Sequence, residues 1–67
     1  MFVLKLDDGP RFPPVYFAGF CRDPLCPVRI KPKSDAVRFD DIREVMKVQR
    51  EIHDRTPGTS FIIEYVG

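Results

Sequence analysis

The fold is decided by residues 41–66, DIREVMKVQREIHDRTPGTSFIIEYV. Apolar and amide side chains in its first part recur at the spacing of one helical face, which predicts a helix from Asp41 to about Arg55. The side chains on that face are Ile42, Val45, Met46, Gln49 and Ile52. Asp40 or Asp41 is suited to cap the start of the helix, and with Asp41 as the cap, Glu44 completes a pattern that resembles a capping box.

The helix is followed by a short break and a strand. Thr56-Pro57-Gly58 ends the helix, and the apolar run from Phe61 to Val66 predicts the last strand. Because only a few residues separate the two elements, we expect this strand to run back along the helix and to pair beside the first strand.

Three more strands are predicted before the helix. Phe2–Leu6 alternates with period two, Val15–Phe20 is aromatic and uncharged, and Val28–Lys31 is short and followed by Pro32. Val37-Arg38-Phe39 is either a further short strand or the lead-in to the helix. The order β-β-β-α-β predicts a single α+β domain over residues 1–67, with an antiparallel sheet of three to four strands and the helix packed on one face.

Length and composition limit the function. A chain of 67 residues forms one domain at most, and a hydrophobic fraction of 43% predicts that it folds. The net charge of +1 excludes an acidic DNA mimic and a polycationic tail. No apolar run approaches the length of a membrane span, and the first nine residues do not resemble a signal peptide. We therefore expect no membrane association and a cytoplasmic location, in the producing or the infected cell.

The sequence offers little for catalysis or metal binding. It has one histidine, His53, in the last turn of the predicted helix, and its four glycines form no phosphate-binding loop. Cys21 and Cys26 form a single C-x4-C pair, which is too few ligands for structural zinc. The pair is expected to be reduced in the cytosol, although a local disulfide stays open as an alternative. We expect no enzyme activity, no cofactor and no metal.

Basic side chains offer a first candidate contact surface. Arg29, Lys31 and Lys33 alternate, so they would project from one face if the third strand continued that far. Such a ridge could meet phosphates or an acidic protein surface. The alternative is a solvated edge strand whose lysines deter association between sheets.

The face of the sheet away from the helix offers a second candidate. Phe2, Leu4, Leu6, Phe61, Ile63 and Tyr65 form the predicted inner set, which leaves Val3, Ile62 and Val66 facing outward. In the second strand, Val15 and Phe17 are expected to point one way and Tyr16, Ala18 and Phe20 the other. An apolar outer face predicts a partner or a homodimer, which Ile62→Glu would disrupt. The alternative is that the proline-rich loops cover it, with Phe12 or Leu25.

The chain resembles small phage-encoded accessory proteins over most of its length. The similar segments are FVLKLDDG at residues 2–9, AVRFDDIREV at residues 36–45 and FIIEYV at residues 61–66. The resemblance implies a short sheet with one helix and a closing strand. It also implies a protein that binds and blocks a host protein, including defence nucleases such as CRISPR effectors.

These observations predict a non-enzymatic binding module that inhibits or modulates a host protein or complex. The expected contact residues are Val3, Tyr16, Phe20, Arg29, Lys31, Lys33 and Ile62. The alternative is a small nucleic-acid-binding protein that uses the basic strand, with Tyr16 and Phe20 as stacking groups. The modest net charge predicts that any such binding is weak and falls steeply with salt.

Overall fold

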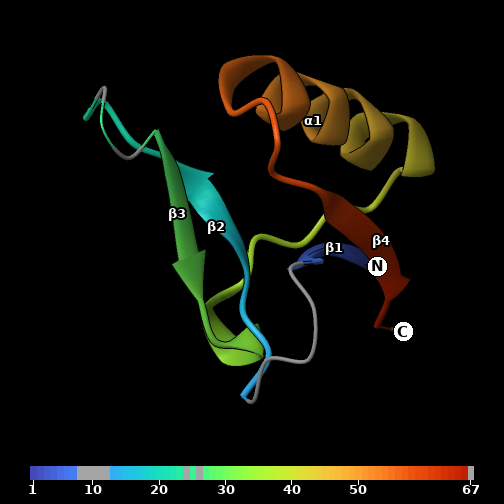
Figure 1. Ribbon diagram of the computed structural model, residues 1–67. Coiled ribbons are helices and arrows are strands. Elements are labelled where there is room, and N and C mark those ends of the chain that lie inside the picture. The colour runs from blue at the N-terminus through green and yellow to red at the C-terminus, as the bar shows by residue number, and fades with distance from the viewer. Residues whose placement is uncertain (8–12, 24, 26, 67) are drawn as a thin grey trace.

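The computed structural model describes residues 1–7, 13–23, 25 and 27–66, and shows an antiparallel sheet of four strands with one helix (Figure 1). The expectations for Phe12 and Cys26 lie outside the described residues. The elements are β1 (Phe2–Leu6), β2 (Tyr16–Phe20), β3 (Val28–Lys31), the 3-10 helix η1 (Lys33–Asp35), α1 (Ile42–Arg55) and β4 (Phe61–Tyr65). The strand order is β3-β2-β1-β4, so the predicted α+β class and the order β-β-β-α-β are confirmed.

Both ends of α1 follow from local chemistry. The Asp41 carboxylate accepts a hydrogen bond of 2.9 Å from the backbone N–H of Arg43, which satisfies one of the amides that a helix start leaves unpaired. At the other end, the N–H and the hydroxyl of Thr56 both donate to the Ile52 carbonyl. Gly58 then takes a φ of +93°, which turns the chain toward β4. The predicted helix bounds are therefore confirmed.

The core lies between α1 and the sheet. Its buried residues are Leu4, Phe17, Phe39, Val45, Ile52 and Phe61. The predicted apolar stripe of the helix is only partly buried, because Ile42 and Met46 keep 42% and 54% of their surface exposed. Since α1 packs on β1 and β4, it covers two of the four strands (Figure 1).

The first and last strands form the longest ladder of the sheet. Pairing runs without a break from Phe2 opposite Tyr65 to Leu6 opposite Phe61, which confirms that the last strand lies beside the first. Residues opposite each other share a face of the sheet. Leu4 and Phe61 therefore face the helix as predicted, and Val3 and Ile62 face away from it.

The first two strands pair only briefly. Lys5 opposite Tyr16 is their one register pair, and the space beyond it is filled by residues 37–39. Phe39 exchanges two backbone hydrogen bonds with Phe2, of 2.8 and 2.9 Å, and the Val37 N–H donates to the Phe17 carbonyl at 3.0 Å. The segment predicted as a short strand or a lead-in is thus a bridge between β1 and β2, and it adds Phe39 to the core.

The predicted facing of β2 is wrong at Phe20. The register of β2 against β3 shifts between Phe17 and Phe20, which marks a β-bulge at Ala18-Gly19. Gly19 has a φ of +120°, a conformation that suits glycine. The bulge turns Phe20 to the helix side, where its ring lies 5.1 Å from that of Phe17.

Candidate functional site

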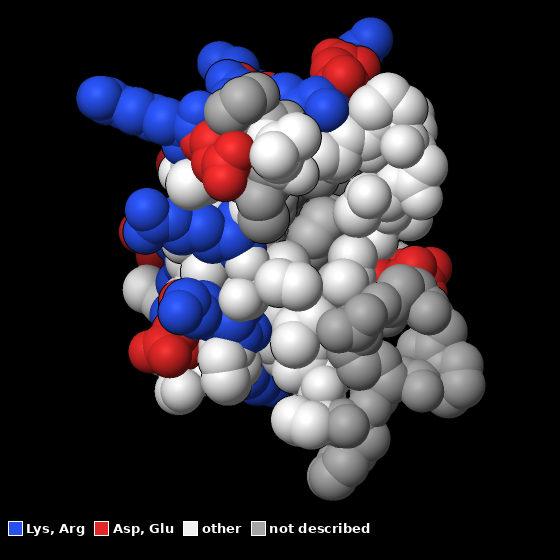
Figure 2. Space-filling view, turned by 60° about the vertical axis from the view of Figure 1, so that its left-hand side comes forward, with Lys and Arg blue, Asp and Glu red and all other residues white. Residues whose placement is uncertain are grey.

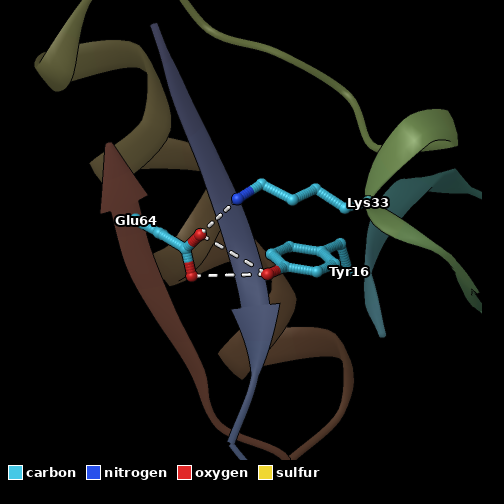
Figure 3. A network of polar contacts seen from close by, with 3 residues as sticks. All are labelled: Tyr16, Lys33 and Glu64. Atoms are coloured by element: carbon cyan, nitrogen blue, oxygen red, sulfur yellow. Dashed lines mark hydrogen bonds and ion pairs between the residues drawn. The ribbon is translucent and has the colours of Figure 1, made fainter. Parts of the chain in front are cut away.

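The outer face of the sheet is covered at its centre. Val3 and Tyr16 keep only 0% and 3% of their surface exposed, although both face away from the helix. The Tyr16 hydroxyl lies 3.4 Å from both carboxylate oxygens of Glu64, and Lys33 Nζ lies 2.9 Å from Glu64 Oε1 (Figure 3). The side chains of Tyr16 and Lys33 both reach across β1 to Glu64 on β4, and they pass over Val3, the residue of β1 that pairs with Glu64. Val3 and Tyr16 are therefore not open to a partner, contrary to the prediction.

This network perturbs the ionisation of all three side chains. Burial and the neighbouring Glu64 charge raise the pKa of Tyr16, against an opposing effect of Lys33. The hydrogen bond from Lys33 lowers the pKa of Glu64, and the same bond raises the pKa of Lys33. Each shift favours the protonation state that holds the network together, so Glu64 stays anionic and Lys33 cationic.

The predicted basic ridge is shorter than expected. Strand β3 ends at Lys31, and Lys33 belongs to η1, where its ammonium group forms an ion pair with Glu64. Lys33 therefore lies outside the strand that carries the other two residues, although its side chain reaches over the same outer face. Arg29 and Lys31 remain exposed on the outer side of β3, at the edge of the sheet.

Neither predicted stacking residue presents a free aromatic face. Tyr16 is buried, and the Arg55 guanidinium lies 4.5 Å from the centre of the Phe20 ring. Arg55 also pairs with Glu51 at 2.9 Å, which keeps the guanidinium beside the ring. These contacts remove the base-stacking platform on which the nucleic-acid alternative depended.

Exposed apolar surface lies instead on the helix side of β3. Ile30 is 41% exposed and Leu25 is 93% exposed. Both line a groove of ≈ 270 Å³ between the β2–β3 hairpin and the turn that follows α1. Its other apolar lining comes from Leu6, Pro27, Val28 and Phe61. Sequence reasoning missed this groove, and the available signal was that one helix is too narrow to cover four strands.

Charged and apolar surface are separated around this edge. Seen from the β3 side, Lys and Arg side chains, with some Asp and Glu between them, gather along one margin of the molecule, next to an area formed mainly by uncharged residues (Figure 2). The register explains this separation, because Arg29 and Lys31 face outward while Val28 and Ile30 face the groove.

A thiol lies beside the same strand. Backbone hydrogen bonding from Asp23 and the side chain of Arg29 lower the pKa of Cys21. Cys21 is half-buried and forms no disulfide with any described residue. Arg29 therefore interacts with a neighbouring thiol as well as with solvent.

A second groove lies at the opposite edge of the sheet. It measures ≈ 370 Å³ and runs between α1 and β4. Gln49 donates a hydrogen bond to the Phe61 carbonyl there, and Met46 and His53 contribute to the lining. Ile62, the remaining predicted contact residue, is 44% exposed on the outer side of this edge.

Comparison with protein-family models, with curated proteins and with solved structures finds no match for this chain. Within residues 1–7, 13–23, 25 and 27–66, no three His, Cys, Asp or Glu side chains are grouped as a metal site would need. In the same residues, no helix is long and apolar enough to span a membrane. The two edges of the sheet are thus the surfaces on which a function can be argued.

Proposed function

We propose that this chain is a non-enzymatic binding module that docks an extended, acidic segment of a partner protein along the edge strand β3. One observation carries the proposal: β3 lies at the edge of the sheet with two exposed cations on one face and an exposed isoleucine over an apolar groove on the other.

The charges of β3 select the kind of partner. An edge strand can accept a further strand through its backbone groups. A second β3 would bring Arg29 and Lys31 against their own copies, and like charges oppose that pairing. Acidic side chains at alternate positions of a partner strand would instead lie beside these cations.

The groove supplies the other half of the specificity. A strand added beside β3 directs every second side chain toward the helix side. An apolar side chain there would lie near Ile30 and fill the groove lined by Leu25, Val28 and Phe61. The segment that fits therefore alternates acidic and apolar residues.

The origin of the partner rests on the sequence resemblance alone. If the chain acts as the phage accessory proteins that it resembles, the segment belongs to a host protein or complex, which the chain inhibits or modulates. A defence nuclease is one such target.

The test uses charge reversal at the edge. A synthetic peptide of alternating aspartate and leucine is titrated against the wild type and against Arg29→Glu/Lys31→Glu, with fluorescence polarisation as the readout. The matched control is Arg43→Glu/Lys47→Glu, which reverses two exposed cations on α1. Binding to the wild type and the control, with loss in the β3 variant, supports the proposal. Equal binding by all three proteins contradicts it.

A parallel titration separates the nucleic-acid alternative. Single-stranded oligothymidine is added to the same three proteins at low and at moderate salt. If the wild type and the control bind the oligonucleotide tightly and only the β3 variant does not, the β3 surface binds nucleic acid and not a protein segment. We expect weak binding that disappears at moderate salt, because only two phosphate-binding cations remain on this strand.

A further inference from the structure

We propose that the other edge strand, β4, pairs antiparallel with β4 of a second copy, with Ile63 on the twofold axis, so that the two sheets become one. This inference concerns the edge opposite β3 and is independent of the partner proposed there.

The backbone groups of β4 alternate in direction. Phe2 uses its N–H and C=O toward Phe39, on the β2 side of β1. Val3 and Lys5 therefore use theirs toward their β4 partners, Glu64 and Ile62. The N–H and C=O groups of Phe61, Ile63 and Tyr65 consequently point away from β1, to the edge of the sheet. The Phe61 carbonyl already accepts a hydrogen bond from Gln49, which agrees with this direction and leaves one lone pair of that oxygen for the N–H of a second strand.

The composition of β4 does not protect this edge. Strand edges are commonly guarded by lysine or proline, which discourage a second strand. β4 has the sequence FIIEY, with neither residue, and its one charge is held by Lys33 over the sheet. By contrast, β3 has two cations and is flanked by Pro27 and Pro32.

Charge and length select one register. The groups that point outward belong to residues 61, 63 and 65, so these must face one another across the twofold axis. An axis at Glu64 would place the two Glu64 carboxylates side by side, which is unfavourable. An axis at Ile62 leaves Tyr65 unpaired. An axis at Ile63 pairs all five residues, with Phe61 opposite Tyr65 and Ile62 opposite Glu64.

The helix contributes an apolar contact at the same axis. Gln49 is level with Phe61 because the two are hydrogen-bonded. Ile63 lies about 6.6 Å further along the strand, a distance that about four helical residues span. Because α1 and β4 run in opposite directions, this places the buried Val45 level with Ile63, and its exposed neighbour Met46, with 54% of its surface accessible, lies within one residue of that level. The two copies of Met46 then approach each other across the axis.

The two helices have opposite directions in this arrangement. A twofold axis perpendicular to the sheet makes the two α1 helices antiparallel on one face. The two helix dipoles are therefore opposed.

The exposed Tyr65 also gains a neighbour in the proposed dimer. Tyr65 is 69% exposed in the single chain. In the proposed register, Tyr65 of the second copy lies opposite Phe61 on the helix side of the sheet. That position adjoins the groove of ≈ 370 Å³ lined by Met46, Gln49 and Phe61.

The first test measures mass in solution with matched variants of the two edges. We expect wild type to approach twice the 7.8 kDa of one chain by light scattering as its concentration rises. Ile62→Glu places a carboxylate opposite Glu64 of the second copy and should keep the chain monomeric. Ile30→Glu makes the same change at a residue of similar exposure, 41% against 44%, on the β3 edge and should leave the dimer intact.

The second test reads the register in the wild-type chain and does not depend on a variant that folds. Amide hydrogen exchange is followed at low and high protein concentration. The N–H groups of Ile63 and Tyr65 should become protected only at high concentration. Those of Ile62 and Glu64 bond to β1 and should be protected at both.

Three results would overturn the proposal. They are a wild type that stays monomeric at millimolar concentration, a dimer that either survives Ile62→Glu or is lost equally in Ile30→Glu and Ile62→Glu, and a dimer whose concentration-dependent protection falls on β3 or on Ile62 and Glu64.

Discussion

Lys33 and Glu64 are 31 residues apart in the chain, and an ion pair of 2.9 Å joins them across β1. Together with Tyr16, the pair covers the centre of the outer face, at the position of the fully buried Val3. The surface that the alternation of β1 and β4 left apolar and open is therefore closed by a lysine from η1 and a tyrosine from β2.

The Lys33–Glu64 pair predicts a specific loss of stability in acid. The pKa of Glu64 is lowered from 4.5 in the folded chain, chiefly by the bond from Lys33. The pair's contribution to the free energy of unfolding is complete above the pKa that Glu64 has in the unfolded chain. It is lost as pH falls through the lower pKa that Glu64 has in the folded chain. Urea unfolding followed against pH should show a weaker acid dependence in Glu64→Gln and in Lys33→Met, with little further change in the double variant. Additive effects of the two substitutions would contradict the pairing.

Tyr16 should ionise above its ordinary pKa of 10.0. Burial favours the neutral phenol, and the Glu64 carboxylate adds to this effect. The chain has two tyrosines, so Tyr65→Phe leaves the Tyr16 phenolate as the one tyrosine absorbance signal. In the Tyr65→Phe background, Glu64→Gln should lower the pH midpoint of Tyr16 ionisation, and Lys33→Met should raise that midpoint. Since the folded pKa is raised, the associated stability is present below pH 10 and is lost as pH rises through the folded pKa. A midpoint at or below 10 would contradict the burial of this ring.

Cys21 should be alkylated by iodoacetamide at lower pH than an ordinary thiol, because its pKa is lowered by the Asp23 backbone and by Arg29. The measurement uses a Cys26→Ser background and follows the rate against pH. Arg29→Gln should move the midpoint upward, whereas Lys31→Gln removes the same charge from the same strand and should move it less. Equal shifts of the Cys21 midpoint in the two variants would indicate a long-range effect of positive charge and not a contact between Cys21 and Arg29.

Gly19→Ala should lower the free energy of unfolding by roughly 1–3 kcal/mol, measured by urea denaturation, because residues other than glycine are strained at positive φ. Its φ is +120°, and no atom lies within 4 Å of the position that a Cβ would take. The loss would thus come from the backbone conformation and not from a clash. An alanine variant as stable as wild type would show that the β-bulge adjusts without cost.

The elements could be predicted from the sequence because each has a local cause. Period two fixed β1, and helical spacing with an aspartate cap and a Pro-Gly stop fixed α1. The pairing of β4 beside β1 also followed, since the turn after α1 is short. These properties depend on neighbours in the chain, which the sequence displays directly.

The candidate site could be predicted only in part, because it depends on where strands end and bend. Arg29 and Lys31 were correctly placed on one face of β3, but Lys33 was not, since Pro32 ends the strand and η1 begins. Phe20 changed face because of a bulge that one glycine permits. The exposure of Ile30 depends on which strands α1 covers, and that is a property of packing that no local pattern encodes.

The two neighbours of β1 have a consequence for the order in which the chain can fold during synthesis. β1 precedes its partners in the chain, because it is held on one side chiefly by Phe39 and on the other by β4, and both are made later. Its one register pair with β2 is too little to hold it meanwhile. The β4 side of β1 therefore stays unpaired until residues 61–65 have been translated, and structure forms by closing long loops. During that interval the growing chain presents to chaperones and proteases the strand that is most deeply enclosed once folding is complete.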